Sequence, residues 1–207
     1  TWEFSYRELR GQRRPVDQST AHRADQEPTA DSSHGVLIMV APEQSPSEFD
    51  VEDLLTWVKQ GNYLLYLDNF PYHASRRLLN KISMDVRNLE PPLHDKASDP
   101  VFRDPLYAHL RTVKISANQS LKGGRPIATV DGIAIISEQN EGKGKILIGS
   151  CPSLIDNRHL GNSESWSNFQ FIHNWLDTTD GDIIFDERCH GATQGISVYY
   201  YFLKGPA

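Results

Sequence analysis

The sequence predicts an α/β fold with a mainly parallel sheet and an antiparallel hairpin extension. Residues 36–68 read as strand, helix and strand, which is a βαβ unit of right-handed connection. Residues 126–151 read as strands joined by tight turns, which would add antiparallel neighbours to the parallel core. A last apolar run at residues 182–185 is expected to be a further parallel strand.

The βαβ unit has the clearest local signals. Residues 36–41 (VLIMVA) and 63–68 (YLLYLD) are continuous apolar runs, which is typical of strands covered on both faces. Between them, Ser45 is expected to cap a helix, with Glu48 completing a capping box. Gly61 is expected to end that helix.

The elements outside this unit follow from weaker patterns. Residues 74–86 predict a helix, residues 90–105 an irregular excursion rich in proline, and residues 109–116 a short strand. Residues 163–177 predict the last helix. Its inner face is expected to carry Trp166, Phe169, Ile172, His173 and Leu176.

Length and composition indicate one soluble domain spanning residues 1–207. We expect an N-terminal helix, edge strand and mobile loop in residues 1–34, the core in 35–191, and a C-terminal extension in 192–207. The net charge of −6 argues against binding to nucleic acid or to anionic membranes. No stretch reaches the ~18 apolar residues that span a bilayer, and a chain that starts at Thr1 suggests an excised segment.

Polar residues follow three of the predicted strands. They lie at residues 68–69, 150–158 (SCPSLIDNR) and 186–190. Because ligands of open parallel sheets bind at the carboxyl ends of the strands, these clusters are expected to converge on one binding edge. The candidate binding residues are Asp68, Asn69, Asn157, Arg158, Asp186, Glu187, Arg188 and His190.

Cys151 is the alternative candidate, as a catalytic nucleophile. It follows a strand, as a nucleophile elbow would, and His190 could activate it. However, Pro152 and the residues after it indicate a loop where the elbow requires a helix, so an inert core thiol is favoured. A disulfide with Cys189 stays open.

A metal site is not expected. Glu187 and His190 are spaced at i, i+3, but the chain lacks HExxH, CxxC and HxH patterns that would complete a ligand set. Pairing of Glu187 with Arg158 or Arg188 is the favoured interpretation, and no cofactor is expected.

Residues 142–145 (GKGK) are also not expected to bind phosphate. They precede a strand, whereas a phosphate loop follows one, and Ile146 stands where that loop needs Ser or Thr.

The order of these motifs resembles a bacterial membrane-associated family known as domain of unknown function 4350. The similarity covers residues 35–191 and, more weakly, 2–18. Cys189 departs from the pattern, because the family often has a second histidine or an aromatic residue there. The matching residues are Gly142 to Lys145, Asn157, Arg158, Leu160, Asn168, and Phe185 to Gly191.

The resemblance implies both a fold and a setting. It implies a flavodoxin-like three-layer α/β/α sandwich, similar to class I glutamine amidotransferases but without their cysteine nucleophile. Members of the family usually place the domain between two membrane helices, outside the cytoplasm, and are often encoded beside MoxR-type ATPases. The resemblance therefore implies partners among envelope proteins, such as an ATPase system of this type, with the membrane reached through segments missing from this chain.

The leading hypothesis is a non-catalytic, extracytoplasmic domain on the periplasmic side that binds a ligand or a protein. The alternative is a hydrolase or transferase that uses Cys151, or a Glu187 and His190 site with a metal or water.

Overall fold

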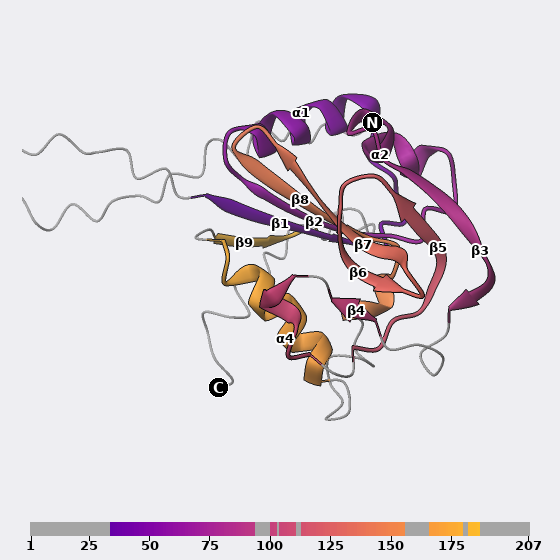
Figure 1. Ribbon diagram of the computed structural model, residues 1–207. Coiled ribbons are helices and arrows are strands. Elements are labelled where there is room, and N and C mark those ends of the chain that lie inside the picture. The colour runs from indigo at the N-terminus through magenta and orange to yellow at the C-terminus, as the bar shows by residue number, and fades with distance from the viewer. Residues whose placement is uncertain are drawn as a thin grey trace, which may run out of the picture.

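The computed structural model describes residues 34–93, 100–102, 104–110, 113–155, 166–179 and 182–186. The strands are β1 (Gly35–Val40), β2 (Tyr63–Leu67), β3 (Asp85–Leu93), β4 (Val101–Phe102), β5 (Ala117–Lys122), β6 (Arg125–Val130), β7 (Ile133–Glu141), β8 (Gly144–Gly149) and β9 (Asp182–Phe185). Seven of them form one mixed sheet in the order β4-β6-β7-β8-β2-β1-β9, and β3 pairs with β5 in a second, antiparallel sheet (Figure 1).

Helices cover both faces of the large sheet. The helices are α1 (Glu48–Lys59), α2 (Arg77–Lys81) and α4 (Trp166–Leu176), and the 3₁₀ turns are η2 (Ala74–Arg76), η3 (Pro105–Tyr107) and η4 (Pro152–Ile155). Helices α1 and α2 pack on one face, whereas α4 packs on the other together with η3 and η4 (Figure 1). The core is therefore divided by the sheet into two apolar clusters.

The prediction of a flavodoxin-like three-layer sandwich with a mainly parallel sheet is wrong. In the large sheet the pairs β9-β1, β1-β2 and β2-β8 are parallel, but β8-β7, β7-β6 and β6-β4 are antiparallel. The physical reason is that the chain between residues 125 and 149 returns by tight turns and has no crossover helix there, so neighbouring strands must run in opposite directions. The result is a strand-rich mixed sheet.

The region after β2 also differs from its expectation. A helix was predicted at residues 74–86 and an irregular proline-rich segment at 90–105, but α2 has only five residues and β3 begins at Asp85. Pro91 and Pro92 are tolerated in β3 because they lie in the irregular stretch between Asn88 and Leu93, where the register with β5 shifts. The prediction of a short strand at 109–116 is wrong: residues 109–110 and 113–116 form no strand, and β5 starts at Ala117.

The βαβ prediction is confirmed, with a shift of the cap. Strands β1 and β2 pair in parallel and α1 connects them. The residue that caps α1 is Ser47 and not Ser45. The Ser47 side chain accepts a hydrogen bond from the backbone N–H of Asp50 at 3.2 Å. In return, the Asp50 carboxylate accepts one from the backbone N–H of Ser47 at 2.8 Å. Gly61, at φ +117°, ends the helix as expected.

The predicted inner face of α4 is right for Ile172 and Leu176, which are half-buried against the core, and wrong for Phe169 and His173. Asn168, Phe171 and Trp175 are buried, whereas Phe169 is 40% exposed and His173 is exposed. The stripe of these three buried residues was missed because its first member is polar, and a polar residue does not count toward an apolar periodicity.

The side chain of the buried Asn168 makes hydrogen bonds to two backbone segments, as a neighbouring strand would. Its Oδ1 accepts from the N–H of Lys114 at 2.8 Å, and its Nδ2 donates to the carbonyl oxygens of Lys114 at 2.9 Å and Leu154 at 3.1 Å. The asparagine of the family motif thus satisfies backbone groups that burial would otherwise leave without partners.

The glycine-led start of β8 has a steric cause. A Cβ on Gly142 would lie 2.7 Å from the carbonyl oxygen of Lys59, and one on Gly144 would overlap the carbonyl oxygens of Val58 and Asn62. The backbone N–H of Lys143 donates to the Lys59 carbonyl at 3.1 Å. These glycines let the turn before β8 pack directly against the end of α1, which explains the motif without a phosphate.

We expect Gly144→Ala to lower the free energy of unfolding by about 3 kcal/mol, because backbone atoms on both sides leave no room for a methyl group. The matched control is Gly132→Ala in the β6-β7 turn, where a Cβ meets nothing within 4 Å and only the positive φ of 79° opposes it. The free energy of unfolding of that control variant should fall by only about 1 kcal/mol. Urea unfolding measures both, and equal losses would contradict the steric explanation.

Candidate functional site

The carboxyl ends of β2 and β8 form the point at which the connections of the sheet diverge. The chain leaves β2 toward the face of α2, and it leaves β8 toward the opposite face, where η4 and α4 lie (Figure 1). Ligands of open α/β sheets bind outside strand ends where connections diverge in this way. The residues that follow these two strands are therefore the first place to look for a site.

Asp68 lies at this point and is almost completely buried, with 4% of its surface exposed. Its backbone N–H donates to the carbonyl of Gly149 at 3.0 Å, so it lies beside the end of β8. Its Oδ1 accepts from the N–H of Asn69 at 2.7 Å, but its Oδ2 has no hydrogen-bond partner among the described residues. A buried acceptor without a partner costs about 1–3 kcal/mol, and more when it is charged.

Burial raises the pKa of the Asp68 carboxyl from 3.8 to about 6, although hydrogen bonds from the N–H groups of Asn69 and Phe70 act in the opposite direction. The carboxyl is therefore ionised at neutral pH at a cost to the folded state. A buried carboxyl with a raised pKa at the end of a strand is a candidate functional residue.

Neighbouring side chains do not complete the coordination of Asp68. The fully buried Ser150 follows β8, but it donates its one hydroxyl proton to the carbonyl of Gln119 at 2.6 Å. That proton is not available to Asp68.

The two arginines after β2 are also engaged elsewhere. Arg76 donates to the carbonyl of Phe70, at 3.4 Å from Nε and 3.5 Å from the terminal nitrogen. Arg77 donates to the carbonyl of Pro46 at 2.9 Å. Both cations thus fix the backbone of the loops that follow β1 and β2.

The backbone is strained after β2 and after its neighbour β1. Ala41, after β1, has φ +43°, and Phe70, after β2, has φ +46°. The left-handed region costs a non-glycine residue about 1–3 kcal/mol and is found at ligand clamps more often than elsewhere. Strain and an unpartnered carboxylate oxygen therefore occur together at one place.

Two exposed aromatic residues lie in the segments that follow β1 and β2, and sequence reasoning missed them. Phe49, in the first turn of α1, is 81% exposed, and Tyr72, in the loop after β2, is 73% exposed. Helix α2 joins the two regions, because Lys81 pairs with Glu48 at 3.3 Å. An apolar residue on the polar side of the α1 pattern was the signal that could have found Phe49.

The structure places three of the sequence-predicted binding residues. Asp68 forms the buried centre and Asn69 is exposed beside it. Asp186 follows β9 and its N–H donates to the carbonyl of Ile38 at 3.0 Å, so β1 separates it from β2. The described part of the chain therefore brings the ends of β2 and β8 together, with Asp186 farther along the same edge. Five predicted residues lie outside the described part: Asn157, Arg158, Glu187, Arg188 and His190.

Cys151 is a packing residue in this structure. It is fully buried in the apolar cluster that contains Leu154 and Phe171, and it carries a free thiol. Burial raises the pKa of this thiol to about 12, so the nucleophilic thiolate is not populated at neutral pH.

Within the described residues, no group of three or more His, Cys, Asp or Glu side chains is placed to hold a metal ion. The expectation about Glu187 and His190 lies outside those residues.

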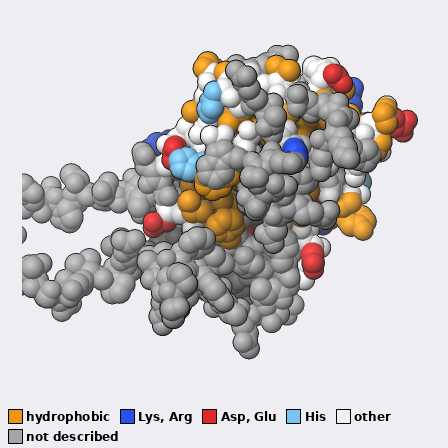
Figure 2. Space-filling view, turned by 90° about the horizontal axis from the view of Figure 1, so that it is seen from below, with side chains coloured by type: hydrophobic (Ala, Val, Ile, Leu, Met, Phe, Trp, Pro, Cys, Tyr) orange, Lys and Arg blue, Asp and Glu red, His pale blue; other side chains and the backbone are white. Residues whose placement is uncertain are grey.

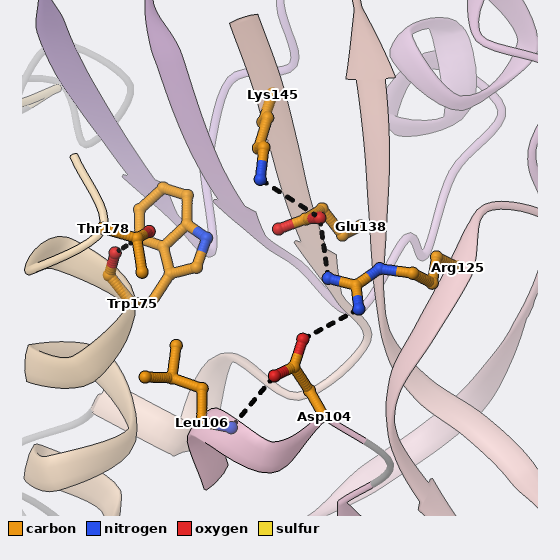
Figure 3. A network of polar contacts seen from close by, with 7 residues as sticks. All are labelled: Asp104, Leu106, Arg125, Glu138, Lys145, Trp175 and Thr178. Atoms are coloured by element: carbon orange, nitrogen blue, oxygen red, sulfur yellow. Dashed lines mark hydrogen bonds and ion pairs between the residues drawn. The ribbon is translucent and has the colours of Figure 1, made fainter.

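A second polar cluster lies toward the opposite end of β8 (Figure 3). Arg125 bridges Asp104 at 2.8 Å and Glu138 at 2.9 Å, and Lys145 approaches Glu138 at 3.7 Å. The N–H of Leu106 and then Arg125 hold the pKa of the Asp104 carboxyl below its usual value. Two acids and two bases balance here, and the network joins β6, β7, β8 and η3. Its residue on β8, Lys145, lies about 13 Å along the strand from the carboxyl end, so the network is separate from Asp68.

The side of the molecule that carries α4 shows hydrophobic side chains at its surface (Figure 2). On β9 and α4, the exposed large apolar residues are Ile183 (46%), Phe185 (43%) and Phe169 (40%). In the described sheet β9 is an edge strand. An edge strand with apolar side chains is a surface suited to contact with another protein segment.

Comparison with protein families decides what the chain is related to. The model of the family described as domain of unknown function, DUF4350, matches residues 6–176. The chain belongs to this family. The match includes the glycine-led start of β8 and Asn168 but ends before the segment 183–191, so the resemblance of that segment stays a prediction.

Solved structures show similarity of this DUF4350 domain in fold only. The "mmIFT52 N-terminal domain" has a TM-score of 0.52 at 16% identity, covering 70% of this chain and 78% of that one. A beta-galactosidase from Bacillus circulans sp. alkalophilus has a TM-score of 0.46 at 13% identity, and the alignment covers 72% of this chain but only 23% of the beta-galactosidase chain. The "Cytoplasmic Protein STM1381" from Salmonella typhimurium LT2 gives 0.42 at 11%, covering 59% of each chain.

No curated protein matches the DUF4350 chain. Among its described helices, none has the length and apolar character needed to cross a membrane.

We expect Asp68→Asn to stabilise the DUF4350 domain at neutral pH. Because the folded pKa of about 6 exceeds the reference value of 3.8, the proton on Asp68 favours folding below pH 3.8, and this contribution is lost as the pH rises through 6. The rise of the pKa from 3.8 to about 6 sets an upper limit of about 3 kcal/mol. Thermal unfolding should show a gain at about pH 7.5 that fades at about pH 4.

The matched control is Asp182→Asn, which removes the same charge from an exposed residue at the start of β9. It should show no such pH dependence. A variant at Asp68 that is destabilised equally at both pH values would contradict the assigned cost of burial.

We expect Cys151 to be inert toward an aromatic disulfide reagent in the native domain, because its sulfur is buried and protonated. The measurement uses Cys189→Ser, so that one thiol remains, and follows release of the coloured thiol at about pH 8. Reaction should appear only after unfolding in guanidinium chloride. Rapid reaction of the native protein would return Cys151 to the list of candidate nucleophiles.

Proposed function

We propose that this DUF4350 domain is a non-catalytic binding domain that recognises a protein partner at the carboxyl ends of β2 and β8. The observation that carries the proposal is the carboxylate of Asp68, which is buried at this point with one oxygen lacking a partner. We define the binding edge as Asp68, Asn69 and Tyr72, with Phe49 beside it.

The energetics of Asp68 support binding. Replacing an acid by a neutral residue would remove the cost of keeping it ionised and buried, so the acid opposes stability. Groups that reduce stability in this way are characteristic of functional sites, since a ligand can supply the missing hydrogen bond.

The exposed aromatic residues support a protein as the ligand. Tyr72 and Phe49 present large rings to solvent, and aromatic residues are enriched at protein interfaces and among the residues that contribute most to binding. The apolar edge at β9 offers a further contact surface on the same domain.

We also propose that the domain works outside the cytoplasm, on the periplasmic side, as part of a membrane-anchored envelope protein. The support is the resemblance described from the sequence, which implies flanking membrane segments and partners in an envelope assembly such as a MoxR-type ATPase system. The negative net charge argues against nucleic acid as a partner.

The enzyme alternative receives less support. Cys151 is buried among apolar side chains, which opposes its use as a nucleophile. The alternative with Glu187, His190 and a metal or water rests on residues outside the described part of the chain.

The experiment compares partner capture by matched variants. Immobilised wild-type domain and the Asp68→Asn, Tyr72→Ala and Asp182→Asn variants are incubated with detergent-solubilised envelopes, and captured proteins are quantified by mass spectrometry. We expect one set of partners to fall about tenfold with Asp68→Asn and to be unchanged with Asp182→Asn. Asp182 is the control because it is exposed at the amino end of β9, away from the binding edge.

Equal capture by wild type and by Asp68→Asn would overturn the proposed edge. Thermal unfolding of each variant shows whether a loss of capture follows from a loss of folding.

A further inference from the structure

We propose that the group recognised at the binding edge is a cationic side chain, an arginine or lysine of the partner protein, which donates to Oδ2 of Asp68. This inference rests on the proposed function, because it names the chemistry of the same site. Its basis is a count of the donors and acceptors around Asp68.

The carboxylate has one oxygen satisfied and one not. Oδ1 accepts from the N–H of Asn69 at 2.7 Å, and Oδ2 has no partner among the described residues. A carboxylate only accepts hydrogen bonds when ionised, so whatever completes it must bring a donor.

The described donors beside this carboxyl are already used, including the N–H groups of Asn69 and Phe70, which both act to lower its pKa. The hydroxyl of Ser150 donates to the carbonyl of Gln119 at 2.6 Å, and the backbone N–H of Asp68 donates to Gly149 at 3.0 Å. The described residues therefore do not supply the missing donor, and a bound partner can.

A cation fits better than a neutral donor. Arg76 and Arg77 bind the carbonyls of Phe70 and Pro46, and only burial and two backbone hydrogen bonds act on the pKa of Asp68, so no described cation pairs with its negative charge. Hydrogen bonds between a cation and a carboxylate are stronger than neutral ones, and most so where water is excluded. A metal ion is a poorer choice, because the described residues hold no group of three metal-ligating side chains.

Access requires the loop after β2 to move, because Asp68 is only 4% exposed. The loop combines a strained residue, whose ring is buried, with three exposed ones. Phe70 is held at φ +46°, and the next three residues, Pro71 to His73, are exposed. Opening the loop would release a strained conformation and bring the ring of Tyr72 next to the incoming cation, where aromatic faces attract positive charge.

The test compares two peptides of the same shape and different charge. Acetyl-Gly-Arg-Gly-amide and the corresponding citrulline peptide, which is neutral, are titrated into the wild-type domain at constant ionic strength. Amide chemical shifts in two-dimensional NMR report binding. We expect the arginine peptide to move the signals of Asn69, Phe70 and Tyr72 and to bind about tenfold more tightly than the citrulline peptide.

Asp68→Asn should remove the preference for arginine, because the amide presents no charge to the peptide. Asp182→Asn should keep it. Guanidinium chloride is the third probe, and equal occupancy of the edge by this salt and by the peptide would overturn the assignment to a partner's side chain. Equal binding of the two peptides to the wild-type domain would overturn the cationic assignment as a whole.

The two proposals fail in different experiments. If Asp68→Asn abolishes capture of envelope partners but the peptides bind equally, the edge is an interface that recognises a neutral group. If the variant leaves capture unchanged, the proposed function itself is wrong.

Discussion

The parallel pairing of β2 with β1 on one side and β8 on the other is the constraint on which the rest of the structure depends. Leu64 and Leu65 point to opposite faces of the sheet and both are fully buried, so both faces need a cover. Helices α1 and α2 cover one face and α4 the other. Because the connections after β2 and β8 leave toward opposite faces, the chain separates at their carboxyl ends, and Asp68 lies at that separation.

Two sequence motifs of the kind often assigned to a binding site have structural roles in this domain. The glycines before β8 allow the turn to press against α1, and Asn168 completes the backbone hydrogen bonds of Lys114 and Leu154. Family motifs in this domain therefore include positions required for close backbone contact. The function of the DUF4350 family is better sought at residues that oppose stability, such as Asp68 with its unpartnered oxygen and Phe70 with its strained backbone.

The sequence alone predicted the candidate residue but not its environment. Asp68 was expected at a binding edge because it follows an apolar run, which is a local signal. Its burial could not be predicted, since it arises from packing between segments far apart in sequence, as the contact of Ser150 with Gln119 illustrates. The exposure of Tyr72 and the protonated, enclosed state of Cys151 depend on the same packing.

What the sequence determined by itself was the βαβ unit, because residues 35–67 contain their own signals: apolar strands, a capping box and a glycine stop. The tertiary structure decided which strands pair beyond it. Residues 85–93 became a strand against β5 despite their two prolines, and the sheet became mixed because tight turns reversed the strands from 125 to 149. Strand pairing is a contact between distant segments, and local propensity does not specify its partner or its direction.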